Sequence, residues 1–437
     1  MKILHLSNYY PPFYEGSTEI QTYQLVQELE RRGNHKQQVL TSDFTPVGQS
    51  SESSDVFRQI QIADHIERQQ SVFRDLHIHP GYSGNLGPAG SGHESFWRLY
   101  RRERYNVEVL RRRLERFGPD LIFVWGFQGL SGAMLFYIEN CGIPCAYGII
   151  NDWPTVWLKN EPWLDTWRGY SRGSDSVIKP MLEGLHLSEF IRKKAPFGEP
   201  ANICLQRSFF CSGSLKKAAG RDGFEVSHSE VIPCAVPVER YYRKENHPPR
   251  LRHLLYIGRL NEEKDPLTAL QALQILHRKG HTEFTLDLHR HGNLEHEKRL
   301  LAYIVRSNLR GAVRFTQTVQ EQQHVTLYSY DMLISTSKWP EPFPLMQLKG
   351  MAAGLPVVTT LVGGHAELIR DRENALAFKT SDPKDLAEKI LELSENPDLV
   401  KKLTSTAYEE VCSKFSLSCI GERVDYFISA SQKVAAC

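Results

Sequence analysis

The stretch "EPFPLMQLKGMAAGLPVVTTLVGG", residues 341–364, combines a short acidic and aromatic loop, an apolar helix and a β-branched strand. Pro344 suits the start of the helix, because a proline's missing N–H is not needed in the first turn. A Gly-Leu-Pro turn leads into the strand, which is followed by Gly363 and Gly364. A loop, helix and strand in this order indicate one repeat of an alternating α/β fold.

The same stretch has the chemistry of a phosphate and sugar site. The first turn of the helix offers unpaired N–H groups and the positive end of a dipole, and both favour a phosphate ligand. Glu341 in the preceding loop can accept hydrogen bonds from sugar hydroxyl groups. Gly363 and Gly364 either let the backbone approach a ligand or simply form a tight turn.

Strand and helix patterns alternate over most of the 437 residues. The first series contains buried-strand patterns at 2–7 and 120–126, and helical patterns at 18–33 and 94–118 that each end at a glycine. A second series begins with a strand pattern at 251–260. This alternation predicts parallel strands joined by crossover helices, which is a doubly wound α/β fold, in two or three domains.

The composition is that of an ordinary globular protein, with 41% hydrophobic and 24% charged residues. The formal net charge is +2, so we expect no nucleic-acid partner, because such proteins usually carry a strong basic excess. The first residues resemble a strand rather than a signal peptide, and no apolar run reaches the length of a membrane span. We therefore expect a cytoplasmic protein, with peripheral contact to the inner face of a membrane left open.

Two cations follow the first strand of the second series. The stretch "YIGRLNEEKDP", residues 256–266, places Arg259 and Lys264 just beyond a buried strand. In open α/β sheets ligands bind beyond the carboxyl ends of the strands, and these two side chains would suit a diphosphate. The alternative is that both are surface charges paired with Glu262 and Glu263.

The other phosphate-binding patterns are absent from the sequence. Gly16 and Ser17 follow the first strand, but the loop is neither Gly-x-Gly-x-x-Gly nor a P-loop. No Asp-x-Asp pair stands at a strand end, so we expect no metal ion and no other cofactor. The counter-charge for a departing diphosphate would then come from Arg259, Lys264 and a helix dipole.

Several motifs, in order, carry a family resemblance that spans nearly the whole chain. They are "YYPPFYEGSTEIQTYQLVQELERRG", "NDWPTVW", "VIPCAVPVERYY", "YIGRLNEEKDPLTALQAL" and "EPFPLMQLKGMAAGLPVVTTLVGGHAELIRDRENALAF". With these the chain resembles retaining GT-B glycosyltransferases of family four. The resemblance implies two Rossmann-like, doubly wound domains facing a central cleft. It implies an acceptor domain at 1–242, a nucleotide-sugar domain at 243–414 and a helix within 415–437 that crosses back to the first domain.

The resemblance also implies roles for individual residues. Arg259 and Lys264 match the pair that grips the donor diphosphate, and Glu341 matches a glutamate near the transferred sugar; these three are the expected catalytic residues. The backbone N–H groups of Leu345 and Met346 would reach sugar or phosphate oxygens. The remaining donor-binding positions that the resemblance implies are Gly16, Ser17, Asn151, Asp152, Gly258, Gly292, Phe343, Pro344 and Lys349.

Four of these positions depart from the family pattern. Lys349 stands where the family usually has a glutamate that binds the ribose, and a lysine has no acceptor. Asn151 replaces a histidine, Ser17 replaces a glycine, and Gly292 alone remains of a Gly-x-Gly. Either other groups hold the ribose, or the donor differs, or donor binding is weak or lost.

The expected reaction is the transfer of a sugar, with retention, from a nucleotide-diphosphate sugar to a glycan, lipid-linked or small-molecule acceptor. A UDP-sugar is the expected donor. The alternative is a catalytically weakened or inactive GT-B protein that acts as a binding or partner subunit. Four tryptophans within 153–167 are either walls of the acceptor site or members of the core.

Overall fold

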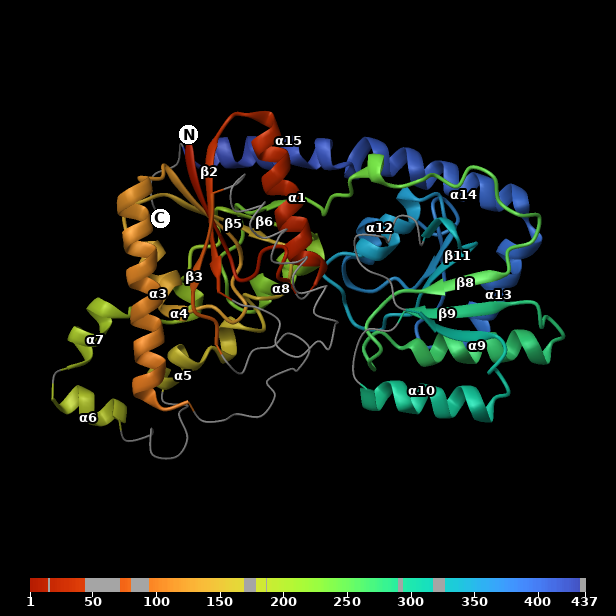
Figure 1. The fold of residues 1–437 in the computed structure, drawn as a ribbon, viewed down its shortest axis with the longest axis horizontal. Coiled ribbons are helices and arrows are strands. Elements are labelled where there is room, and N and C mark those ends of the chain that lie inside the picture. Colours follow the sequence, from red (N-terminus) through yellow and green to blue (C-terminus); the bar gives the residue numbers. More distant parts are fainter. Residues whose placement is uncertain are drawn as a thin grey trace. The chain divides into compact units, whose positions relative to one another are not determined.

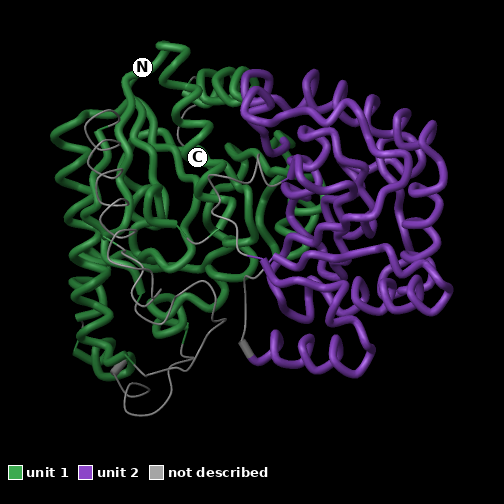
Figure 2. Tube along the Cα trace, turned by 45° about the vertical axis from the view of Figure 1, so that its right-hand side comes forward, with its two compact units in different colours: residues 1–232, 421–437 green, residues 233–420 purple. Residues whose placement is uncertain are grey.

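The computed structural model describes residues 1–14, 16–43, 71–79, 94–168, 178–185, 187–289, 294–316 and 327–432. The chain divides into two compact units, one of residues 1–232 with 421–437 and one of residues 233–420 (Figure 2). The sequence suggested divisions at 242/243 and 414/415, whereas the units change at 232/233 and within the last helix at 420/421.

The first unit, in which Figure 1 labels β2, β3, β5 and β6, is built on a seven-stranded parallel sheet in the order β3-β2-β1-β4-β5-β6-β7. Every residue of β4 is buried, as expected for a strand in a sheet covered on both faces. The strands are β1 Lys2–Ser7, β2 Lys36–Ser42, β3 Val72–Leu76, β4 Leu121–Gly126, β5 Cys145–Ile149, β6 Ser208–Phe210 and β7 Glu230–Val231.

The helices of the first unit connect these strands, and the two for which the sequence predicts a glycine end have it. Gly33 and Gly118 both adopt the left-handed conformation that closes a helix, with φ of 72° and 60°. The helices are α1 Ser17–Arg32, α3 Phe96–Phe117, α4 Gly132–Asn140, α5 Pro162–Arg168, α6 Ile178–Gly184, α7 Ser188–Lys194 and α8 Gly213–Arg221. The last helix of the chain, α15 Leu417–Ser431, joins this unit from Gly421 onward.

The second unit contains a six-stranded parallel sheet in the order β10-β9-β8-β11-β12-β13. Its strands are β8 His253–Tyr256, β9 Thr285–His289, β10 Val313–Thr316, β11 Met332–Ser335, β12 Val357–Thr359 and β13 Leu376–Ala377. Its helices are α9 Pro266–Arg278, α10 Leu294–Arg306, α12 Leu345–Ala352, α13 Pro383–Glu395 and α14 Pro397–Glu410. The predicted α/β class and the two doubly wound, Rossmann-like sheets are confirmed.

Both sheets reverse their strand order once, and this fixes where ligands can bind. In the second unit the chain moves outward from β8 to β10 on one side, then returns to β11 beside β8. Loops that leave neighbouring strands at such a switch point diverge and leave room for a ligand at the carboxyl ends. No helix in the described part of the chain is long and apolar enough to span a membrane.

The end of the chain is fastened to the first unit by polar contacts. The Asp425 carboxylate on α15 lies 2.6 Å from His35 Nε2 and 2.6 Å from Asn34 Nδ2, through its two oxygens. The His35 side chain is only 4% exposed, so the carboxylate is a structural acceptor for a buried ring. These contacts join α15 to the turn between α1 and β2.

We expect Asp425→Ala to lower the free energy of unfolding of this unit by about 1–3 kcal/mol, because it leaves a buried donor unsatisfied. Six of the seven tryptophans lie in this unit, with Trp339 outside it, so tryptophan fluorescence in urea reports the effect. Glu422→Ala, at an exposed position of the same helix, is the matched control. Equal losses in the two variants would show that the carboxylate does not fasten the helix.

Candidate functional site

The loop after β8 is held in shape by hydrogen bonds to its backbone. The hydroxyl of Tyr256 donates to the Lys264 carbonyl at 3.0 Å. The Thr336 hydroxyl lies within hydrogen-bond distance of the carbonyls of Lys264 and Asp265, at 2.9 and 2.7 Å. The Lys264 N–H donates to Asn261 Oδ1 at 3.0 Å. The backbone that carries the Lys264 side chain is therefore fixed by side chains from β8, from the loop itself and from the end of β11.

Lys264 and Glu341, which the sequence proposed separately, meet in an ion pair. Lys264 Nζ lies 2.6 Å from Glu341 Oε1, and the two side chains are only 19% and 15% exposed. The alternative prediction, in which Glu262 and Glu263 pair with the lysine, is wrong for Lys264. Arg259 is exposed, and its guanidinium has no ion-pair partner among the described residues.

A third side chain of this cluster was missed by the sequence interpretation. His365 is fully buried, and its Nε2 lies 3.6 Å from the same Glu341 oxygen. Its Nδ1 lies 2.7 Å from the Thr360 carbonyl oxygen, which can only accept, so Nδ1 carries a proton. The signal was available: a histidine directly after Gly363 and Gly364, where a strand ends. Lys264, Glu341 and His365 follow β8, β11 and β12, three strands that are neighbours in the sheet.

The cluster keeps Glu341 ionised. Burial alone would raise its pKa, but the nearby His365 ring and the charge of Lys264 prevail and lower the pKa of Glu341 to about 2. At neutral pH this carboxyl group is therefore a hydrogen-bond acceptor and a counter-ion, and it carries no proton to donate.

The glycine pair holds the Glu341 loop in place by close contact. Gly363 has φ of +57°, and a Cβ there would lie 2.5 Å from the Glu341 carbonyl oxygen. A Cβ at Gly364 would collide with the Pro342 carbonyl oxygen, and the Gly364 N–H donates to the Glu341 carbonyl at 2.7 Å. The glycines therefore let two loops of the protein approach each other.

The start of α12 has the form that the sequence predicts. Pro344 is the residue that precedes the first helical turn, and no side chain caps the helix. The Leu345 N–H reaches back to the Phe343 carbonyl at 3.0 Å, and Phe343 itself is buried. The residues Leu345 and Met346 are partly exposed, so this end of the helix is accessible.

Lys349 lies on the same helix. Its side chain is partly accessible, but burial of the ammonium group lowers the pKa of Lys349 to about 8. Its charge is therefore close to titration near neutral pH. The following residue, Gly350, is packed so tightly on β11 that a Cβ would lie 2.5 Å from Leu333 Cδ2.

The remaining predicted positions belong to the first unit, apart from Gly258, which is partly exposed in the loop after β8, and Gly292, which lies outside the described residues. The Gly16 N–H donates to Glu19 Oε2 at 3.0 Å, and Ser17 begins α1. Asn151 Nδ2 donates to Gln128 Oε1 at 3.1 Å. The four positions in this unit are Gly16, Ser17, Asn151 and Asp152, which follow the carboxyl ends of β1 and β5.

The four tryptophans are core residues. Trp153 and Trp163 are fully buried, Trp157 and Trp167 are at most 9% exposed, and Trp167 stacks on Phe197 with ring centroids 3.8 Å apart. The interpretation of these residues as core is therefore correct, and they do not form an open acceptor wall.

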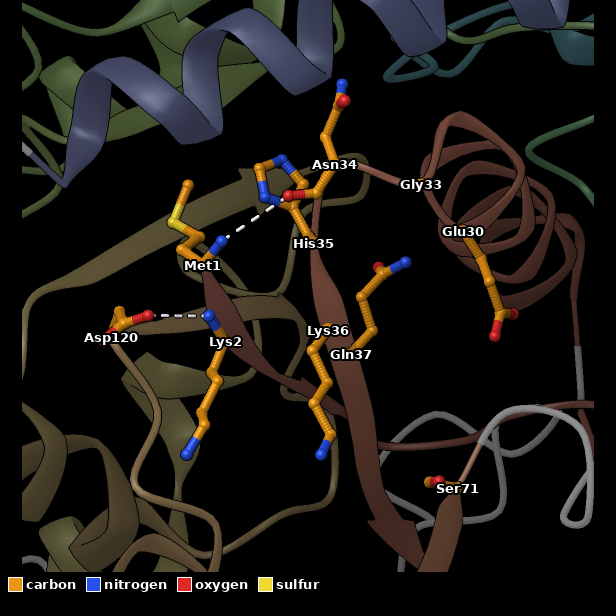
Figure 3. Close-up of a pocket in the computed structure, with 10 residues that line it drawn as sticks. All are labelled: Met1, Lys2, Glu30, Gly33, Asn34, His35, Lys36, Gln37, Ser71 and Asp120. Carbon is orange, nitrogen blue, oxygen red and sulfur yellow. Dashed lines mark hydrogen bonds between the residues drawn. The ribbon is translucent and has the colours of Figure 1, made fainter.

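A cavity of about 670 Å³, whose lining residues are drawn in Figure 3, lies at the amino ends of strands of the first sheet, whereas the predicted site residues of this unit follow carboxyl ends. It surrounds the amino ends of β1 and β2, and is lined by Met1, Lys2, Glu30, Gly33, Asn34, His35, Lys36, Gln37, Ser71 and Asp120. None of the predicted site residues lines it, although Glu30 and Gly33 belong to the first of the quoted motifs. Within the described ranges no three His, Cys, Asp or Glu side chains are grouped so that they could hold a metal ion.

Comparison with known proteins shows which family the region that contains Lys264, Glu341 and His365 is similar to. Residues 238–410 match the family model of the glycosyl transferases group 1. The chain is 28% identical over 178 residues to spore coat protein SA of Bacillus subtilis, covering 39% of this chain and 47% of that protein. It is 28% identical over 169 residues to D-inositol 3-phosphate glycosyltransferase of Nocardioides sp., covering 36% of this chain and 37% of that enzyme. The chain thus spans less than half the length of these curated relatives.

Solved structures match over nearly the whole chain. Anabaena HepE, in complex with UDP and glucose, superposes with a TM-score of 0.64 at 16% identity, covering 98% of this chain and 100% of HepE. Sucrose-phosphate synthase of Thermosynechococcus elongatus gives a TM-score of 0.65 at 17% identity, with 98% of each chain covered. The fold is GT-B, as the motifs predicted, and residues 238–410 match the glycosyl transferases group 1.

The lowered pKa of Glu341 predicts an acid-dependent stability of the second unit. Because the folded value of about 2 lies below the ordinary 4.5, the stabilisation is fully present above pH 4.5 and is lost as the pH falls toward 2. A shift of this size corresponds to about 3 kcal/mol, which Glu341→Gln should remove from the pH dependence.

The measurement is native-state hydrogen exchange of the β8 and β11 amides between pH 2.5 and 7. Glu262→Gln, at an exposed carboxylate of the neighbouring loop, should keep the wild-type pH dependence. If wild type and Glu341→Gln lose protection in parallel as the pH falls, the ion pair does not support this unit.

Proposed function

We propose that the protein is a retaining glycosyltransferase that moves a sugar from a nucleotide-diphosphate sugar, a UDP-sugar, to a hydroxyl group of a glycan, lipid-linked or small-molecule acceptor. The observation that carries the proposal is the Lys264–Glu341 ion pair at the strand ends of a glycosyl transferases group 1 domain. The choice of UDP is supported by HepE, which shares the fold and was solved with UDP and with UDP-glucose.

In this proposal the cations receive the donor's diphosphate. The Lys264 ammonium group is directed by a fixed backbone, and the exposed Arg259 guanidinium offers a fork of donors for phosphate oxygens. The uncapped start of α12 adds the N–H group of Met346 and, once it turns from the Phe343 carbonyl to the ligand, that of Leu345. These groups supply the counter-charge, and we therefore propose that no metal ion is needed.

The proposed reaction is a displacement on one face of the sugar. The bond from the anomeric carbon to the phosphate oxygen breaks with its electron pair, the acceptor oxygen bonds to the same face, and the leaving oxygen takes the acceptor's proton. The protein contributes positioning and stabilisation of the charge that develops on the phosphate. Glu341, ionised at neutral pH, holds Lys264 and accepts hydrogen bonds from the sugar.

The other predicted positions complete the proposed donor site. Gly16 and Ser17 would lie against the phosphate, and Asn151 and Asp152 would contact the sugar. Lys349 would take the place near the ribose, where it can donate a hydrogen bond but cannot accept one. If this substitution has abolished donor binding, the protein is the weakened or inactive GT-B subunit that forms the alternative.

We expect Lys264→Ala to lower the transfer rate by roughly 10²-fold or more, because one preorganised contact to the leaving group is lost. We also expect UDP to raise the melting temperature of the wild type and to raise that of Lys264→Ala less. Thermal shifts and initial rates should be measured with UDP-, GDP-, ADP- and dTDP-sugars.

Lys279→Ala is the matched control, since this exposed lysine lies at the other end of α9 from the site. It should bind and turn over like the wild type. An unchanged rate in Lys264→Ala would contradict the proposed role of the lysine. The absence of any shift with every nucleotide would contradict the enzyme and favour the binding subunit.

We further propose that the first unit touches an anionic membrane surface from the cytoplasmic side, which would suit a lipid-linked acceptor. Large apolar side chains are exposed on α6, on α7 and between them: Met181, Leu185, Leu187 and Phe190. Three consecutive basic residues follow directly at the end of α7: Arg192, Lys193 and Lys194. Apolar groups beside such cations fit the interface of a membrane that carries negative headgroups.

The double variant Leu185→Ser with Phe190→Ser should bind vesicles of phosphatidylcholine and phosphatidylglycerol about tenfold more weakly than the wild type in co-sedimentation, because two side chains no longer enter the interface. The control, Leu301→Ser with Val305→Ser, removes two exposed apolar side chains from α10 and should bind like the wild type. Equal binding of all three proteins would remove α6 and α7 from the proposal.

A further inference from the structure

The Glu341 carboxylate has two nitrogen partners that differ in their freedom to move. Oε1 lies 2.6 Å from Lys264 Nζ and 3.6 Å from His365 Nε2. The lysine ammonium stands on a four-carbon stem with several rotatable bonds and its side chain is 19% exposed, whereas the histidine is completely buried. A negatively charged ligand can therefore draw Lys264 away from Glu341, whereas the buried His365 ring cannot turn away from it.

Drawing Lys264 away creates a problem for the carboxylate. Glu341 is 15% exposed, and a largely buried charge that loses its partner is strongly destabilised. If the ammonium group turns toward a diphosphate, another donor must serve the carboxylate, or Glu341 will take up a proton or move. Once Lys264 has turned away, the position of Glu341 therefore depends on whether a second donor lies near its carboxylate.

His365 is oriented to provide that donor. Its Nδ1–H is committed to the Thr360 carbonyl at 2.7 Å, which fixes the plane of the ring and directs Nε2 toward Glu341. A neutral ring would present a lone pair to the carboxylate. A ring protonated on both nitrogens presents an N–H, and can close the remaining distance to a hydrogen bond.

We propose that His365 is a positioning residue that, in its doubly protonated form, takes over the Glu341 carboxylate when Lys264 turns to a negatively charged ligand. Glu341 then stays in place through the binding of the ligand, and Lys264 is released at little cost. That the ligand is the diphosphate of a sugar donor rests on the proposed function, whereas the contact between His365 and Glu341 does not.

The surroundings of the pair supply no competing charge. Gln347 on α12 faces His365 with its amide nitrogen 3.5 Å from Nε2, and that nitrogen donates at shorter distances to Ser335 Oγ, at 2.9 Å, and Thr359 Oγ1, at 3.2 Å. Tyr256 on β8 stays neutral, because burial and the charge of Glu341 raise its pKa well above 10. Within the described ranges, the titratable groups that act on Glu341 are thus Lys264, His365 and this phenol.

The test uses Lys264→Met to imitate the state in which the lysine has left. Two substitutions of His365 separate its two nitrogens, because asparagine extends as far as Nδ1 and glutamine as far as Nε2. His365→Asn keeps a donor for Thr360 and loses the one that faces Glu341, whereas His365→Gln keeps the one that faces Glu341. If His365 were purely structural, acting through its contact with Thr360, His365→Gln would be the more harmful of the two substitutions.

The readout is the titration midpoint of the Glu341 carboxyl carbon, followed by ¹³C NMR in the full chain. With Lys264→Met as background, His365→Asn should raise the midpoint by about one pH unit or more, and His365→Gln should raise it less. With Lys264 present, His365→Asn should have a smaller effect, because the two partners substitute for each other. Equal effects in both backgrounds, or no effect without the lysine, would overturn the proposal.

A second readout covers variants that fail to fold. In Lys264→Met alone, the ¹⁵N resonance of His365 Nε2 should show a protonated nitrogen at pH 7, and an unprotonated one overturns the proposal. Binding of UDP-glucose between pH 5.5 and 8.5 then tests the ligand: affinity should fall with rising pH in the wild type and change less in His365→Gln. If UDP-glucose does not bind while the midpoints are non-additive, the donor assignment fails and the role of His365 stands.

Discussion

The ion pair between Lys264 and Glu341 is the interaction on which the rest of the site depends. Taking both charges out of water is costly, and the cost is offset only where the geometry is good and further hydrogen bonds are present. Here the carboxylate has a second nitrogen neighbour in His365, and the lysine backbone is held by Tyr256 and Thr336. The backbone of Lys264 is therefore fixed, while its ammonium group can turn. It can pair either with the Glu341 carboxylate or with an anionic ligand.

Backbone contact, more than side-chain chemistry, determines where the carboxylate of this pair lies. The loop that carries Glu341 lies against Gly363 and Gly364, at distances that leave no room for a Cβ. His365 directly follows these two glycines. A single turn of the chain therefore packs against the Glu341 loop and also places His365 beside the Glu341 carboxylate. Substitution of either glycine would move the acid relative to both bases.

Sequence reasoning recovered the alternation of strands and helices, the glycine ends of α1 and α3, and the residues that converge on the second sheet. It left the pairing of Lys264 open, since Glu262 and Glu263 stand closest to this lysine along the chain, whereas its partner Glu341 comes from the loop after the adjacent strand β11. The order of the strands in the sheet decides which loops lie next to each other, and the periodicity of the sequence does not encode that order. His365 was missed for a related reason, because a histidine in a glycine turn gives no periodic signal and gains meaning only beside Glu341.

The charges at the strand ends determine which kind of ligand suits a cation at position 349. Arg259 and Lys264 exceed Glu341 by one positive charge, so the edge of the sheet favours an anion before any ligand is bound. Lys349 adds a charge that it loses more readily than an ordinary lysine does, because burial lowers its pKa to about 8. A diphosphate close to α12 would oppose that shift and draw a proton to the lysine, whereas an uncharged ribose would not. The protonation of Lys349 on α12 therefore depends on the charge of the ligand in the site.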